Sequence, residues 1–188
     1  MIMIDDRWSV RSITRTLLPI LLVLTGLEIV GGVTLDSFEA TLLEFPTLLV
    51  LVPVTIGTAG NLGSVLSARL STAFHLGTLS FEPTDETLAG NAAVTVLVAV
   101  TVFPAVGAAG WAVTGIVSDP RLAVETVVVV ALASGIALAV VAVVVALTAT
   151  YAAYRFELDP DDVVIPVVTN VCDVLGVVVL FAVVQLLF

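Results

Sequence analysis

The last apolar segment of the chain contains an acidic residue. Asp173 lies about ten residues after the start of this segment and 15 residues before its end. A charge at that depth of a bilayer costs roughly 2.5–3.5 kcal/mol on insertion scales, so such a residue normally faces a cavity or a partner. On a helix, Thr169 and Gly176 share the face of Asp173, and Asn170 lies one step aside with an amide. The alternative is an acid close enough to the helix end to be solvated by lipid headgroups.

A second segment has three glycines at three-residue spacing, Gly57, Gly60 and Gly63. Gly57, Asn61 and Ser64 follow helical spacing and form a small, polar stripe. Small residues of this kind often make a packing seam between spanning helices. Beside a proline they also loosen a helix, so that carbonyl oxygens turn toward a cavity. Both interpretations stay open, and they are compatible.

The oxygen atoms of these two segments are the ligands that a hard cation prefers. A carboxylate, amides, hydroxyls and carbonyls suit Mg²⁺ or Ca²⁺. Ligands for soft metals are scarce, because the chain has one Cys, one His and two Met residues. Mg²⁺ gives up its water reluctantly, so one or two carboxylates acting through water are enough to hold it.

The elements that must position these residues are membrane-spanning helices. Sixty per cent of the 188 residues are apolar and 12% are charged, against about a quarter charged in soluble domains. The apolar runs are long and lack period-two alternation, which predicts helices. We expect an all-α polytopic membrane protein with a stub at 1–12 and one transmembrane domain at 13–188. Its predicted spans are about 13–33, 44–70, 91–117, 123–154 and 163–188. Arg69 and His75 are then expected to belong to the loop that follows the second span.

The charges predict the orientation and exclude one class of partner. A net charge of −10 repels nucleic acid. With five crossings, one arginine, Arg121, falls on one side of the membrane, and the remaining five fall on the other: Arg7, Arg11, Arg15, Arg69 and Arg155. The positive-inside rule then predicts a multi-pass protein of the cell membrane with a cytoplasmic N-terminus and an extracytoplasmic C-terminus.

Two stretches of the sequence resemble a known family. They are Val52–Gly77, VPVTIGTAGNLGSVLSARLSTAFHLG, and Asp159–Pro166, DPDDVVIP, which continues to Thr169 and Asp173–Gly176. In order and separation they resemble the two signature segments of the MgtE-type divalent-cation transporters, and more closely those of solute carrier family 41. The resemblance covers nearly the whole membrane domain.

The resemblance implies an MgtE-like transmembrane domain with a Mg²⁺-selective pathway at a dimer interface, lined by the second and fifth spans. The central ion-binding aspartate of that family corresponds to Asp173. Its glycine-asparagine segment corresponds to Gly57, Gly60, Asn61 and Gly63. Mg²⁺ would be the transported ion, with other divalent cations still open, and no organic cofactor is expected.

Two departures from the bacterial pattern limit what is carried over. Bacterial members usually have glycine at the position of Ala59 and glutamine near Val65. The 188 residues also do not include the N-terminal and CBS domains that gate bacterial members, so gating by those domains is not expected. Passive influx and cation-coupled export are both consistent with the resemblance.

The expected assembly in the bilayer is a homodimer, or a pair with a second half-length homologue, because solute carrier family 41 has two such halves in one chain. A non-transporting membrane subunit, whose Asp173 pairs with a partner helix, is the alternative. An intramembrane aspartyl protease needs two aspartates, and no other span has a central one, so an enzyme is not expected. For Glu28 in the outer half of the first span, the outer interface is favoured over the pathway. His75 is expected to be a loop residue and not a ligand.

Overall fold

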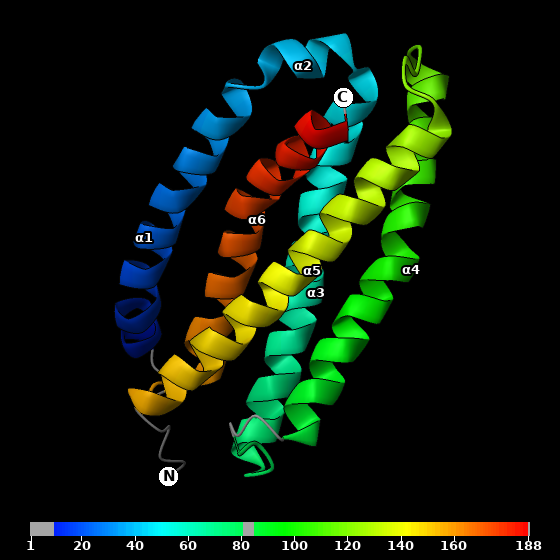
Figure 1. Ribbon diagram of the computed structural model, residues 1–188. Coiled ribbons are helices and arrows are strands. Elements are labelled where there is room, and N and C mark those ends of the chain that lie inside the picture. The colour runs from blue at the N-terminus through cyan, green and yellow to red at the C-terminus, as the bar shows by residue number, and fades with distance from the viewer. Residues whose placement is uncertain (1–9, 81–84, 188) are drawn as a thin grey trace.

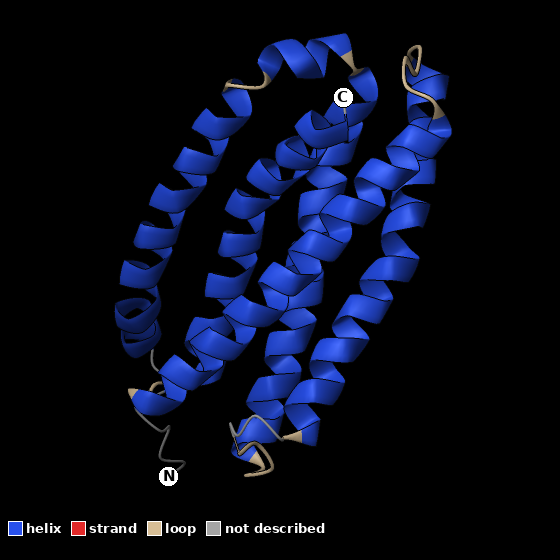
Figure 2. Cartoon of the chain, in the orientation of Figure 1, coloured by secondary structure: helices blue, strands red, loops and turns tan. Residues whose placement is uncertain are grey.

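The computed structural model describes residues 10–80 and 85–187, which form helices and loops without a strand (Figure 2). The helices are α1 (Val10–Asp36), α2 (Glu39–Glu44), α3 (Pro46–His75), α4 (Glu86–Val117), α5 (Val124–Arg155) and α6 (Pro160–Leu187). All except α2 are long and apolar enough to cross a membrane. The prediction of five spanning helices is confirmed. Residues 1–9 of the predicted stub lie outside the described residues, and its last three residues belong to α1.

The long helices form a bundle in which α6 has neighbours on several sides. It packs against α1, α3 and α5, while α4 packs against α3 and α5. In Figure 1, α1 lies at one edge of the bundle and α4 at the opposite edge. The first turn of α1 and the last turn of α6 lie at opposite ends, as an odd number of crossings requires. The two segments singled out by the sequence, α3 and α6, are therefore direct neighbours.

Glycines allow the helices to approach closely. A Cβ atom at Gly135 of α5 would lie 2.0 Å from the Phe103 ring of α4, and one at Gly107 of α4 would lie 2.9 Å from the Cβ atom of Ala131. Phe103 is completely buried in this way. The α4–α5 contact is therefore a packing seam of the small-residue kind.

The predicted end of the second span was too early. Arg69 and His75 belong to α3, which continues because Leu70 and Ala73 are still buried against the bundle. The helix ends at His75, and Gly77, two residues later, has a φ of +67° that favours glycine. There the N–H of Gly77 donates to the Phe74 carbonyl (2.9 Å), and the N–H of Thr78 donates to the Ala73 carbonyl (3.0 Å).

Helix α4 begins earlier than predicted because Asp85 caps it. Its carboxylate accepts hydrogen bonds from the backbone N–H groups of Thr87 (2.8 Å) and Leu88 (3.2 Å). It also accepts from the backbone N–H (2.7 Å) and the hydroxyl (2.9 Å) of Ser80. These bonds, led by the one from the Ser80 backbone, lower the pKa of Asp85 to about 2.

Helix α2 was not predicted. It joins α1 to α3 across one end of the bundle (Figure 1). The Phe38 ring before it stacks on Phe181 of α6 with centroids 3.9 Å apart. Arg121, in the loop between α4 and α5, donates to the Glu44 carbonyl at the end of α2 (2.9 Å). Both contacts hold α2 onto the end of the bundle.

Candidate ion-binding site

Asp173 lies at the middle of α6, the fourteenth of its 28 residues. Its side chain is half-buried and directed toward α3. A Cβ atom at Gly60 would lie 3.4 Å from Asp173 Oδ1 and 3.5 Å from Thr169 Cγ2. The missing side chain of Gly60 therefore leaves the carboxylate room beside α3.

The predicted face of α6 is the face that packs against α3. The Ser64 and Thr169 hydroxyl oxygens are 2.9 Å apart and form a hydrogen bond across the two helices. A Cβ atom at Gly176 would lie 2.7 Å from Ile56 Cγ1. The contact with α3 therefore runs along Thr169, Asp173 and Gly176. The Asp173 carboxylate lies between the polar Thr169–Ser64 contact and the apolar Gly176–Ile56 contact.

The three glycines of α3 differ in their surroundings. Gly60 faces the carboxylate, as described. Gly63 is buried, and a Cβ atom there would lie 2.5 Å from Val168 Cγ1 of α6. Gly57 is exposed, with nothing within 4 Å of a Cβ atom placed on it. Helix α3 is unbroken from Pro46 to His75. Gly63 therefore makes a packing seam with α6, and Gly60 leaves room for the carboxylate, without an interruption of the helix.

The two asparagines offer different groups. Asn61 is exposed at the middle of α3, one turn from Gly57 on the bundle surface. The Asn170 side-chain N–H donates to the Pro166 carbonyl (3.1 Å). Its Oδ1 is buried and has no hydrogen-bond partner within the described residues. Asn170 therefore has a free carbonyl oxygen three residues from Asp173.

The surface of a single chain thus carries polar groups at mid-membrane depth. Asn61, the bare helix at Gly57 and the half-buried Asp173 lie on neighbouring helices at the middle of each. Hydrocarbon satisfies neither the Asn61 amide nor the Asp173 carboxylate. Both groups are costly at this depth unless water, an ion or another polar group is near them.

A cavity of about 180 Å³ opens beside Asp173, between α1, α3 and α6. Its two carboxylates are Asp173 and Glu28, and no arginine lines it. The sequence favours the outer interface for Glu28, and the structure places this exposed residue in the wall of the cavity. The remaining lining residues are Gly31, Gly32, Leu35, Val52, Ile56, Val174 and Val177.

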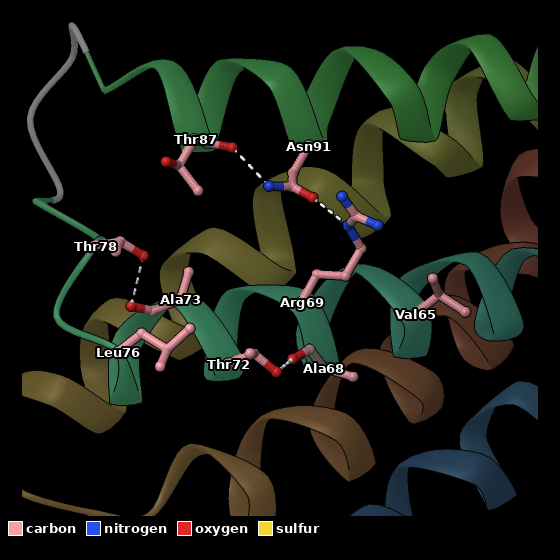
Figure 3. Close-up of a pocket in the computed structure, with 9 residues that line it drawn as sticks. All are labelled: Val65, Ala68, Arg69, Thr72, Ala73, Leu76, Thr78, Thr87 and Asn91. Carbon is pink, nitrogen blue, oxygen red and sulfur yellow. Dashed lines mark hydrogen bonds between the residues drawn. The ribbon is translucent and has the colours of Figure 1, made fainter.

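A second cleft, of about 560 Å³, lies near the end of α3 beside α4 (Figure 3). Arg69 Nε donates to Asn91 Oδ1, and Asn91 Nδ2 donates to the Thr87 carbonyl (2.7 Å). An arginine lines this cleft, and no carboxylate does. It therefore does not suit a cation. Within the described ranges, no group of three or more His, Cys, Asp or Glu residues could hold a metal ion by itself.

The fold and the site define a class: a polytopic helical membrane protein with a carboxylate held at the middle of the bundle between two helices. Residues 52–183 match the family model of the MgtE divalent cation transporters. The chain belongs to this family, so it is a divalent cation transporter. Searches of curated proteins and of solved structures gave no match.

The match includes all residues predicted for the site and ends within α6. It begins at residue 52, so α1 and Glu28 lie outside it. The role of Glu28 therefore has to be argued from the structure. Sequence reasoning placed Glu28 at the interface because a helix alone does not show what lies beside it.

Proposed function

We propose that the protein carries Mg²⁺ across the membrane through a dimeric pathway lined by α3 and α6, with Asp173 as the central ion-binding residue. The observation that carries this proposal is the half-buried Asp173 beside the side-chain-free Gly60, at the middle of both helices. An acid in this place is costly unless a cation or water is near it. In a family of divalent cation transporters, the transported ion supplies that partner.

A second copy of the chain completes the pathway. One chain leaves Asn61 and Gly57 on its surface at mid-membrane depth. A two-fold axis along this surface would place the same residues of both copies opposite each other, since a two-fold interface is isologous. Two Asp173 carboxylates would then face one hydrated ion, with α3 of each copy closing the wall. Pairing with a second half-length homologue would build the same wall.

Magnesium fits the available ligands. Mg²⁺ keeps several waters and needs only one or two carboxylates. The neutral oxygens close to Asp173 are the hydroxyl of Thr169 and the free Oδ1 of Asn170. Helix α3 contributes the exposed Asn61 amide, one turn from Gly57. The carbonyls of Gly60 and Gly63 already accept hydrogen bonds from the hydroxyls of Ser64 (2.9 Å) and Ser67 (2.8 Å), so the role of these two glycines is to leave space beside α6. The amide and hydroxyl groups are suited to hydrogen bonding with the water shell of a hard cation.

The side of the membrane follows from the arginines. The described arginines Arg11, Arg15, Arg69 and Arg155 lie toward the end of the bundle where α1 begins and α3 and α5 end, and Arg121 lies at the other end. The positive-inside rule supports a cytoplasmic N-terminus and an extracytoplasmic C-terminus.

The test is Mg²⁺ flux into proteoliposomes for Asp173→Asn, with Asp119→Asn as the matched control. Asn keeps the size of the side chain and removes its charge, so we expect folding to be retained and flux to fall to the level of protein-free vesicles. Asp119 lies exposed in the α4–α5 loop, and its variant should keep wild-type flux. Wild-type flux from Asp173→Asn would overturn the proposal.

A further inference from the structure

The cavity between α1, α3 and α6 gives Asp173 a neighbour on a helix that the family match does not include. Glu28 is on the side of α1 that faces the bundle. Leu24, one turn earlier, is 5% exposed, and Gly31, one turn later, is buried. These three residues follow helical spacing and share one face.

The depth of Glu28 matches that of Asp173. Helices α1 and α6 run in the same direction (Figure 1). A Cβ atom at Gly31 would lie 3.5 Å from the Cα atom of Val174, the residue after Asp173. Glu28 is three residues before Gly31, so it is level with the turn of α6 that carries Asp173. The two carboxylates therefore enter one cavity at one depth, from two helices.

Nothing in the cavity wall neutralises these two acids. Within residues 10–80 and 85–187, neither Glu28 nor Asp173 has a hydrogen bond or an ion pair. The nearest arginine along α1 is Arg15, which is 13 residues away, about 20 Å along the helix. Two like charges that face one cavity repel each other, and a divalent cation between them replaces this repulsion with attraction to the ion.

The size of the cavity suits a cation that keeps water. Its volume of about 180 Å³ equals roughly six shares of liquid water at ~30 Å³ each. Mg²⁺ in proteins keeps several of its waters and is held by one or two carboxylates. The glycines of the α1 wall, Gly31 and Gly32, leave this space free of side chains.

We propose that Glu28 is a second carboxylate of the ion pathway, which holds one hydrated divalent cation together with Asp173 of the same chain. Helix α1 then forms a third wall of the pathway, together with α3 and α6. This proposal rests on the proposed function, because it takes Asp173 as the ion-binding residue. It adds a ligand on α1, a helix that has no role in a pathway lined by α3 and α6 alone.

The experiment measures Mg²⁺ flux against Mg²⁺ concentration for Glu28→Gln, Glu28→Asp and Glu125→Gln in proteoliposomes. Loss of one charged contact to the ion should raise the half-saturating concentration by about tenfold in Glu28→Gln. Glu28→Asp keeps the charge but withdraws it by one methylene group, so its half-saturating concentration should lie above that of the wild type and below that of Glu28→Gln. Glu125, exposed in the first turn of α5, is the control and should behave as the wild type.

The outcomes separate the two proposals. Equal half-saturation in the wild type and Glu28→Gln, with flux still abolished in Asp173→Asn, overturns the role of Glu28 and leaves the proposed function intact. Wild-type flux in Asp173→Asn overturns both. If Glu28→Gln does not elute as a folded protein, Glu28→Asp decides: a right-shifted saturation curve supports a ligand, and an unchanged curve contradicts one.

Discussion

The surroundings of Asp173 show how the bundle accommodates a carboxylate whose burial in the membrane costs free energy. Its position at the middle of α6 would be unfavourable in hydrocarbon. The bundle lowers this cost locally, because Gly60 removes a side chain beside Oδ1 and the hydroxyl pair of Ser64 and Thr169 lies one turn away. On another side, Asp173 lines the cavity between α1, α3 and α6. The site therefore depends on a missing side chain as much as on the acid.

Replacement of Gly60 by alanine tests this dependence. A Cβ atom at 3.4 Å from Asp173 Oδ1 and 3.5 Å from Thr169 Cγ2 is in ordinary contact, so Gly60→Ala should fold and dimerise as the wild type. The added methyl group would fill the space beside Oδ1 that the proposed hydrated ion needs. We expect Mg²⁺ flux to fall by roughly tenfold, measured in proteoliposomes.

The matched control for this change is Gly26→Ala. Gly26 lies in α1 with nothing within 4 Å of an added Cβ atom and does not line the cavity. Its variant should transport at the wild-type rate. Undiminished flux in Gly60→Ala would show that the α3 side of Asp173 does not face the ion.

Among the elements, glycine seams hold the bundle together. Helices α4 and α5 meet where Phe103 lies over Gly135, and α3 and α6 meet where Val168 lies over Gly63. Without a hydrophobic effect between helices in lipid, such close packing supplies much of the association energy. These seams are separate in role from Gly60, which leaves a space open.

Gly135→Ala should therefore destabilise the bundle. Its Cβ atom would lie 2.0 Å from the Phe103 ring, and overpacking of this kind costs about 1–3 kcal/mol. Gly90→Ala, with nothing within 4 Å, should be neutral or stabilising by up to about 1 kcal/mol, because alanine favours a helix. Thermal unfolding in detergent measures both, and an unfolding temperature of Gly135→Ala at or above that of the wild type would contradict the packing.

The sequence predicted the spanning elements well and their ends less well. Apolar runs and charge clusters were sufficient for five helices, because the bilayer imposes length and internal hydrogen bonding. Hydropathy does not report where a helix continues into water. The end of α3 depends on Gly77 and the start of α4 depends on Asp85. Both are local capping signals in the sequence that hydropathy does not detect. Helix α2, six residues long, is too short for a periodic pattern.

The candidate site was predictable to the extent that it depends on spacing along a helix. The shared face of Thr169, Asp173 and Gly176 followed from helical periodicity, and the structure places that face on α3. Glu28 could not be assigned in this way. Its position beside Asp173 depends on how α1 packs against α6, which is a contact between segments far apart in the sequence.

At the scale of the whole molecule, the proposed pathway needs a second chain. The groove between α1 and α3 contains the carboxylates, and Asn61 and Gly57 are exposed on α3. Apolar side chains cover much of the rest of the surface, as a lipid-facing helix requires. A second copy on this side would bury the polar groups and enclose a pathway between four carboxylates, two from each chain.

The most direct measurement of the central claim is anomalous diffraction from crystals of the protein grown with Mn²⁺, which shares the oxygen ligands of Mg²⁺. The account predicts an anomalous peak at the middle of the membrane, within one layer of water from Asp173 of two facing chains, and no peak in the cleft beside Arg69. A transport-competent protein with its Mn²⁺ peaks away from Asp173, or with Asp173 facing lipid, would contradict it.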